Sequence, residues 1–111
     1  MKKLILALAF VLIFSANAFC HNPSDINVTI KERGIDLVVS HSVSNPATHY
    51  VKRIEVKLNG ENTAEKDFKS QIDDMTQKTS FDILSLKKGD VLEITAYCSK
   101  YGELTKSVTV E

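Results

Sequence analysis

Apolar and polar residues alternate along most of the chain beyond residue 25, with the period of two that is typical of half-buried β-strands. Four runs show the alternation most clearly, with members on one face at Ile26, Val28 and Ile30; at Ile35, Leu37, Val39 and His41; at Tyr50, Ile54, Val56 and Leu58; and at Leu92, Ile94, Ala96 and Cys98. Turn signals lie between them at Arg33-Gly34, Asn59-Gly60 and Lys87-Lys88-Gly89-Asp90. The pattern predicts antiparallel strands joined by short turns.

The remaining segments are patterned more weakly. Residues 61–80 are polar, and we expect a short strand around 65–70, a loop through Asp73-Asp74 and another strand over 78–83. Gly102 interrupts the strand pattern, and a final strand is expected over 104–110, with Val108 and Val110 inward. Beyond residue 18 no stretch has the 3.6-residue period of a helix. The predicted fold class is therefore all-β, an immunoglobulin-like antiparallel β-sandwich of about seven strands.

The first eighteen residues have a different character. A basic start at Lys2-Lys3 precedes an almost unbroken apolar run over 4–14 and the small residues Ser15-Ala16-Asn17-Ala18. This is the pattern of a cleavable signal peptide, and the apolar run is too short to favour a membrane-spanning helix. We therefore expect a signal peptide over 1–18 and one domain over 19–111, exported to the periplasm or secreted and not attached to a membrane after cleavage.

Charge excludes one class of partner. The chain has 14 Lys and Arg against 14 Asp and Glu, and the predicted signal peptide removes two lysines, which leaves a net charge of about −2. Nucleic-acid binding is not expected from such a balance. There is no Gly-rich phosphate loop and no Gly-x-Ser-x-Gly nucleophile motif, and the Asp73-Asp74 pair is typical of a solvated loop.

Histidine and cysteine are the residues that could carry chemistry. His21, His41 and His49, together with Cys98, lie at predicted strand ends or in adjoining irregular segments. His41 and His49 flank one short loop, so their imidazoles can converge on one point. Imidazole and thiolate together suit iron, copper or zinc. The two cysteines of an exported protein also permit a simpler interpretation, a disulfide between Cys20 and Cys98.

Three blocks of sequence resemble the iron-binding domain of desulfoferrodoxin and neelaredoxin, the superoxide reductases. They are His21-Asn22-Pro23, His41 with the later segment Asn45-Pro46-Ala47-Thr48-His49-Tyr50-Val51-Lys52-Arg53-Ile54-Glu55, and Leu92-Glu93-Ile94-Thr95-Ala96-Tyr97-Cys98-Ser99-Lys100-Tyr101-Gly102. They follow the family's order and span nearly all of residues 19–111. The resemblance implies an immunoglobulin-like sandwich, in agreement with the strand pattern.

The resemblance also implies a cofactor and a ligand set. In that family a mononuclear non-haem iron is held by four equatorial histidines and one axial cysteine, and a one-electron reduction of superoxide gives peroxide. Carried over by position, the equatorial ligands would be His21, His41 and His49, and Cys98 would be the axial, catalytic ligand. Tyr101 stands where the family has its fourth histidine, which makes it a candidate substitute. Copper or zinc could replace iron in such a set.

The chain departs from the family in other ways that keep a second hypothesis open. Ser42 follows His41 where the family has proline, the His41–His49 loop is longer, and Cys20 replaces a lysine thought to attract superoxide. No rubredoxin-like Cys-x-x-Cys domain precedes the sandwich. The alternative is a non-catalytic exported immunoglobulin-like module, with a binding or structural role, that has lost the metal and can join Cys20 to Cys98. No particular electron donor is predicted.

Overall fold

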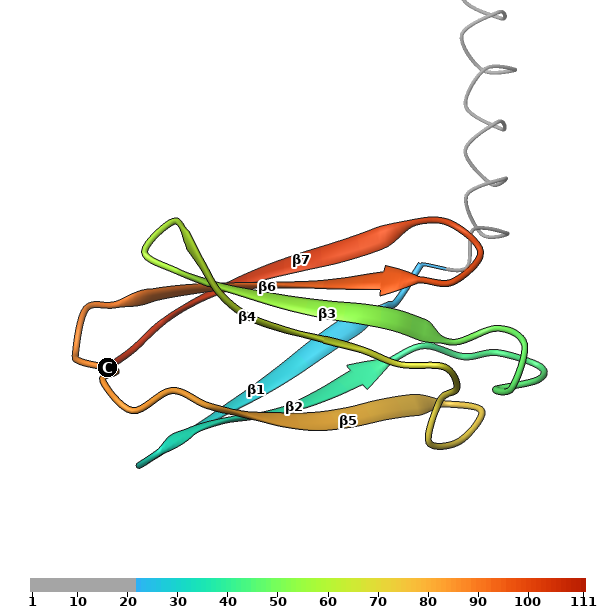
Figure 1. Cartoon of the computed structure of the whole chain (residues 1–111), viewed down its shortest axis with the longest axis horizontal. Helices are drawn as coiled ribbons and strands as arrows, with labels where there is room; N and C mark the ends of the chain where they lie inside the picture. The colour runs from blue at the N-terminus through green and yellow to red at the C-terminus, as the bar shows by residue number, and fades with distance from the viewer. Residues whose placement is uncertain (1–21) are drawn as a thin grey trace, which may run out of the picture.

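The computed structural model describes residues 22–111, and this part of the chain forms seven β-strands. The strands are β1 (Asp25–Lys31), β2 (Gly34–Ser40), β3 (Val51–Leu58), β4 (Glu61–Asp67), β5 (Thr76–Asp82), β6 (Val91–Cys98) and β7 (Glu103–Thr109). β1, β2 and β5 form a three-stranded sheet in that order, and β4, β3, β6 and β7 form a four-stranded sheet. All neighbouring strands are antiparallel. The predicted fold class is confirmed, and Figure 1 shows the two layers.

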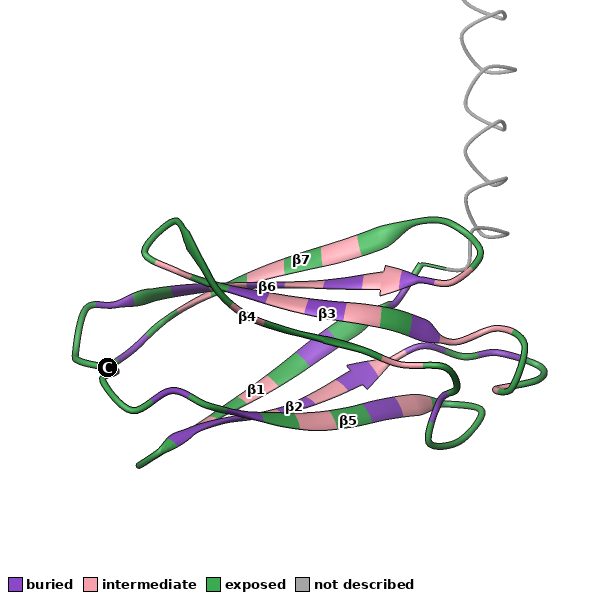
Figure 2. Ribbon diagram, in the orientation of Figure 1, coloured by how far each residue is buried: buried purple, intermediate pink, exposed green. Residues whose placement is uncertain are grey.

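The hydrophobic core lies between the two sheets. Inward positions of β2, β3 and β6 are almost completely buried and alternate with more exposed ones along each strand (Figure 2). The fully enclosed members are Ile26, Ile35, Leu37, Val39, Val51, Ile54, Val56, Leu92, Ile94 and Ala96. Each large aliphatic side chain buried in this way contributes about 1.5–3 kcal/mol to folding. These are mostly the residues that the alternating pattern selected.

One inward position of β3 differs from the prediction. Val51 and Ile54 are both buried although they are three residues apart, and the pairing of β3 with β6 shifts register between Val51 and Arg53. The extra residue is a β-bulge, which lets two inward side chains lie three positions apart. Val51 therefore takes the place that strict alternation gave to Tyr50, which precedes the strand and is only half-buried.

The boundaries of β4 and β5 also differ from the prediction. β4 begins directly after the Asn59-Gly60 turn and ends at Asp67, where a strand over 65–70 was expected. Asn59 and Gly60 both have positive φ, 52° and 89°, as a two-residue hairpin turn requires. β4 is an edge strand whose side chains are mostly exposed, so few apolar residues mark it in the sequence.

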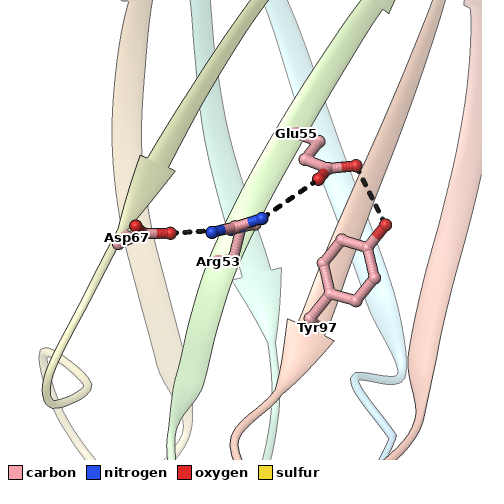
Figure 3. A network of polar contacts seen from close by, with 4 residues as sticks. All are labelled: Arg53, Glu55, Asp67 and Tyr97. Carbon is pink, nitrogen blue, oxygen red and sulfur yellow. Dashed lines mark hydrogen bonds and ion pairs between the residues drawn. The ribbon is translucent and has the colours of Figure 1, made fainter.

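A polar network covers the outer face of the four-stranded sheet just beyond the bulge (Figure 3). Arg53 Nε donates to Asp67 Oδ1 at 2.7 Å, its guanidinium lies 3.6 Å from Glu55 Oε2, and the Tyr97 hydroxyl donates to Glu55 Oε1 at 2.9 Å. The hydrogen bond to Glu55 raises the pKa of Tyr97, and Asp67 raises the pKa of Arg53. The network links β4, β3 and β6 and so holds the register next to the bulge.

One lysine connects the two sheets along an open side of the sandwich. Lys66 of β4 donates from Nζ to Thr79 Oγ1 at 3.0 Å and to the Ser80 carbonyl of β5. Its ammonium also lies 5.0 Å from the centre of the Phe81 ring. Residues 22–111 include no helix with the length and apolar character needed to cross a membrane.

Candidate metal centre

Three of the predicted ligands meet at one end of the sandwich. His41 directly follows β2, His49 lies two residues before β3, and Cys98 is the last residue of β6. In Figure 1 the arrowheads of β2 and β6 and the beginning of β3 lie at the same, right-hand end. One ligand atom from each of the three side chains lies within 4.8 Å of the other two. The three-stranded sheet supplies His41, and the four-stranded sheet supplies the other two.

His41 is placed by a continuation of the β2 ladder. Its backbone N–H donates to the Met75 carbonyl at 2.9 Å, and Val43 N–H donates to the Asp74 carbonyl at 2.8 Å. The alternation of β2 therefore runs one step beyond the strand, and His41 points inward with 1% of its surface exposed. Sequence alternation predicted this direction.

His49 is placed by the turn that precedes it. Asn45 Oδ1 accepts a hydrogen bond from Ala47 N–H at 3.0 Å, and the Asn45 carbonyl accepts from Thr48 and His49 N–H at 3.1 and 2.9 Å. An asparagine before proline is typical of such a turn, because its side chain bonds to the backbone two residues on. The turn brings the chain back so that His49 lies against the end of β6.

Cys98 is held by its own turn and by the segment before β3. Its N–H donates to the Gly102 carbonyl at 2.9 Å, which closes the β6–β7 turn. Ser99 N–H donates to the Tyr50 carbonyl at 2.8 Å, and Tyr50 N–H donates to Ser99 Oγ at 3.0 Å. This reciprocal pair fixes the residue after Cys98 to the residue after His49. Cys98 is a buried, free cysteine with 2% of its surface exposed.

Within residues 22–111, hydrogen-bonding groups from two residues lie beside the sulfur. His49 Nε2 lies 3.1 Å from Cys98 Sγ, and Lys100 N–H donates to the same sulfur at 3.3 Å. The His41 and His49 rings meet edge to face, with centres 5.0 Å apart and planes at 86°. A backbone N–H directed at sulfur is a contact that a metal-bound thiolate can accept. Thiolate is the form that binds metals.

The ligand spacing can be compared with metal geometry. Typical zinc–thiolate and zinc–imidazole bonds of about 2.3 and 2.1 Å put the two ligand atoms about 3.1 Å apart at a right angle and about 3.6 Å apart at the tetrahedral angle. The 3.1 Å between His49 Nε2 and Cys98 Sγ matches the right angle. Both atoms are therefore close enough to bind one metal ion.

The other residues predicted to take part in the site are His21, Cys20 and Tyr101. His21 and Cys20 lie outside the described residues, so the predicted ligand role of His21 and the Cys20–Cys98 disulfide stay predictions. Asn22, next to His21 in sequence, lies against Gly102 in the β6–β7 turn. Tyr101 occupies the same turn with 61% of its surface exposed, and its role as a ligand also stays a prediction.

Sequence reasoning missed one residue that contacts the cluster. Gln71 lies in the connection between β4 and β5, is 6% exposed, and hydrogen-bonds to His41 Nδ1 at 2.8 Å. It belongs to the polar segment 61–80, where no periodicity marks an inward side chain. The only sequence signal was its position in a segment that returns from one sheet to the other.

Comparison with solved structures identifies the fold. The chain is similar to neelaredoxin, a superoxide reductase from Ignicoccus hospitalis, at 22% identity and a TM-score of 0.51, over 82% of this chain and 81% of that one. Two single-substitution variants of neelaredoxin give TM-scores of 0.52 and 0.53 at the same identity, each covering 86% of this chain and at least 85% of the other. The chain has the fold of a superoxide reductase.

The resemblance to superoxide reductases drawn from the sequence blocks is thus confirmed at the level of the fold. No protein-family model matches the sequence, and no curated protein matches it. The superoxide reductase fold and a compact group of two histidines and one cysteine therefore stand together in this chain.

Proposed function

We propose that the protein is an exported non-haem iron protein that reduces superoxide to peroxide. The observation that carries the proposal is the convergence of His41, His49 and Cys98 within 4.8 Å at one end of a superoxide reductase fold. A mononuclear iron at this point would supply one electron to superoxide, which takes up two protons to leave as hydrogen peroxide. An electron donor would have to return one electron to the site for each superoxide reduced.

The protein's own groups have separable tasks in this proposal. His41 and His49 would hold the ion through ring nitrogens, and Cys98 as a thiolate would donate electron density to it. The Lys100 N–H, 3.3 Å from the sulfur, would withdraw part of that density and so adjust the redox potential of a bound ion. Because Cys98 is 2% exposed and His41 1% exposed, bulk water reaches neither ligand easily.

His21 and Tyr101 complete the proposed ligand set. The supporting observation is that Asn22, the residue after His21 in sequence, packs against Gly102 in the turn that follows Cys98. Tyr101 belongs to the same turn. The proposal also includes export by residues 1–18 to the periplasm or outside the cell, superoxide or another small oxidant as substrate, and an electron donor that remains to be identified.

The proposal is tested by the metal content of the full chain purified without chelator. We expect about one iron per chain, loss of superoxide on mixing with the reduced protein, and formation of peroxide. Iron-free protein that cannot be loaded with iron would contradict the proposal and favour the alternative of a non-catalytic module. Zinc or copper in place of iron would contradict the superoxide chemistry but retain a metal centre.

Replacing Cys98 by serine should remove the visible absorption band that a thiolate–iron bond produces. Cys20→Ser is the matched control, because it removes the other cysteine and leaves Cys98 in place. We expect the band in the unmodified protein and in Cys20→Ser, and no band in Cys98→Ser. A band that survives Cys98→Ser would remove Cys98 from the site, and thiols that react only after reduction would show the Cys20–Cys98 bridge.

A further inference from the structure

The side chain of Gln71 makes four hydrogen bonds beside the cluster. Its Oε1 accepts from Val51 N–H at 3.1 Å and lies 2.8 Å from His41 Nδ1. Its Nε2 donates to the carbonyls of His41 at 2.8 Å and Asp73 at 3.0 Å. The amide is buried, with 6% of the residue exposed. Gln71 thus contacts the end of β2, the beginning of β3 and its own loop at the same time.

These partners fix which way the amide points. Val51 N–H can only donate, so the atom facing it must be the oxygen. The two carbonyls of His41 and Asp73 can only accept, so the atom facing them must be the nitrogen. A flipped amide would set donor against donor once and acceptor against acceptor twice, and an unsatisfied buried group costs about 1–3 kcal/mol each time. The orientation therefore follows from neighbours whose roles are not in doubt.

The amide orientation in turn decides the tautomer of His41. Because Gln71 Oε1 can only accept, His41 Nδ1 must carry the proton, and in the neutral ring the lone pair is then on Nε2. We infer that Gln71 is a positioning residue that selects the Nδ1–H tautomer of His41 and presents Nε2 as its metal-binding atom. The metal-binding part of this inference rests on the proposed function, and the tautomer part does not.

Gln71 also connects His41 to the loop that follows it in the chain. Its backbone N–H donates to the Pro46 carbonyl at 3.0 Å, in the loop that leads to His49. The side chain therefore holds the His41 ring, and the backbone holds the loop of the second histidine. Partners of this kind, which orient a metal-binding imidazole without touching the metal, typically change metal affinity 10–100-fold when they are removed.

The tautomer can be measured without metal. Long-range ¹⁵N–¹H correlation spectra of the metal-free full chain, recorded at about pH 8 where an ordinary imidazole is neutral, distinguish Nδ1–H from Nε2–H at each histidine. We expect His41 in the Nδ1–H form. His41 in the Nε2–H form in the unmodified protein would overturn the inference directly, without any variant.

Two substitutions at Gln71 and one control separate positioning from packing. Gln71→Met keeps the length but removes the acceptor, and should cost His41 its uniform Nδ1–H form and lower iron(II) affinity 10–100-fold. Gln71→Glu keeps an acceptor toward Nδ1 and should keep that nitrogen protonated, while the loss of the donors to the His41 and Asp73 carbonyls should lower its stability. Gln77→Met is the matched control, because Gln77 is equally buried at 5% exposure but bonds to the Ser70 carbonyl and Lys78 N–H and not to a histidine.

The outcomes of the two readouts are distinguishable. If Gln71→Met retains the Nδ1–H form, or if Gln77→Met changes the tautomer as much, the positioning role is wrong. If the tautomer responds as expected but the unmodified protein binds no iron, the proposed function fails while the hydrogen-bond assignment stands. If Gln71→Met does not fold, the spectrum of the unmodified protein and of Gln71→Glu still decides the tautomer.

Discussion

Two features require glycine at position 102, namely a positive φ and the close approach of Asn22. Its φ is +99°, a region that side-chain-bearing residues rarely adopt, and a Cβ placed there would lie 1.7 Å from Asn22 Oδ1. Gly60 has a similar φ of +89°, but a Cβ there would have no heavy atom within 4 Å. The two glycines share the conformational constraint and differ in the neighbour.

Gly102→Ala and Gly60→Ala should therefore separate these effects. Each should lower the free energy of unfolding by about 1 kcal/mol or slightly more, because a left-handed backbone disfavours alanine by about that amount. Only Gly102→Ala should shift the side-chain amide resonances of Asn22, which must turn away from the new methyl group. Chemical denaturation and ¹H–¹⁵N spectra measure the two quantities. Equal shifts of Asn22 in both variants would contradict the contact.

For single residues, the alternation of inward and outward side chains along a strand was enough to predict part of the site. His41 and Cys98 each end an alternating inward row, so their direction follows from the sequence pattern alone. Gln71 could not be predicted in this way. Its burial results from a loop folding onto the opposite sheet, and no local period records that contact. The partners of its amide are mainly backbone groups, which leave no mark in residue identity.

Among the elements, the connection between β4 and β5 depends on one carboxylate. Asp73 Oδ1 accepts from Met75 N–H at 2.8 Å, from Thr76 N–H at 2.7 Å and from the Thr76 hydroxyl at 3.0 Å. These hydrogen bonds, that from Met75 first, hold the pKa of Asp73 below its usual value. The same turn offers the Met75 carbonyl to His41 N–H, so its order supports the candidate site.

The stabilisation by Asp73 should depend on pH. Because the folded-state pKa is lowered, the contribution is fully present above the unfolded-state value of about 3.9 and is lost as the pH falls through the folded-state value. Asp73→Ala should therefore be less stable than the unmodified protein at pH 7, with the difference shrinking below about pH 4. Urea denaturation at pH 7 and below about pH 4 measures this difference in the free energy of unfolding. Asp74→Ala is the control, since Asp74 bonds to Val43 through its backbone carbonyl.

Element boundaries show where sequence information ran out. The Asn59-Gly60 hairpin was recognisable because a turn with two positive φ values demands such residues. The extent of β4 was not, since an edge strand with polar side chains on both faces has no apolar alternation to read. The bulge near Lys52 was also hidden, because it arises from the competing needs of pairing with Cys98 and burying both Val51 and Ile54.

For the whole molecule, the closure of the sandwich depends on contacts between sheets. Lys66 is one such contact, and Lys66→Met should lower the free energy of unfolding by about 1 kcal/mol, from the hydrogen bonds to Thr79 and Ser80 and the ring contact with Phe81. Lys57→Met, an exposed lysine of the same sheet, should change it by less than about 0.5 kcal/mol. Equal losses in thermal or urea denaturation would show that Lys66 does not join the sheets.

The overall architecture was the most predictable level. Alternating segments separated by turns are enough to specify packed antiparallel sheets, because every strand other than β4 has one face to bury. Which strands would be neighbours was not specified by that pattern. The order β4-β3-β6-β7 comes from non-local pairing, and it is this order that sets β3 beside β6 and so brings His49 to Cys98.

The division of the candidate ligands between the sheets has a thermodynamic consequence. An ion held by His41 on one side and by His49 and Cys98 on the other would be a cross-link that exists only in the folded chain. Its binding free energy would then add to the free energy of unfolding, by about 2.7 kcal/mol when free metal is a hundred times the dissociation constant. The melting temperature of this small protein would therefore rise and fall with the metal in its surroundings, and a chelator titration followed by melting would read the affinity of the site.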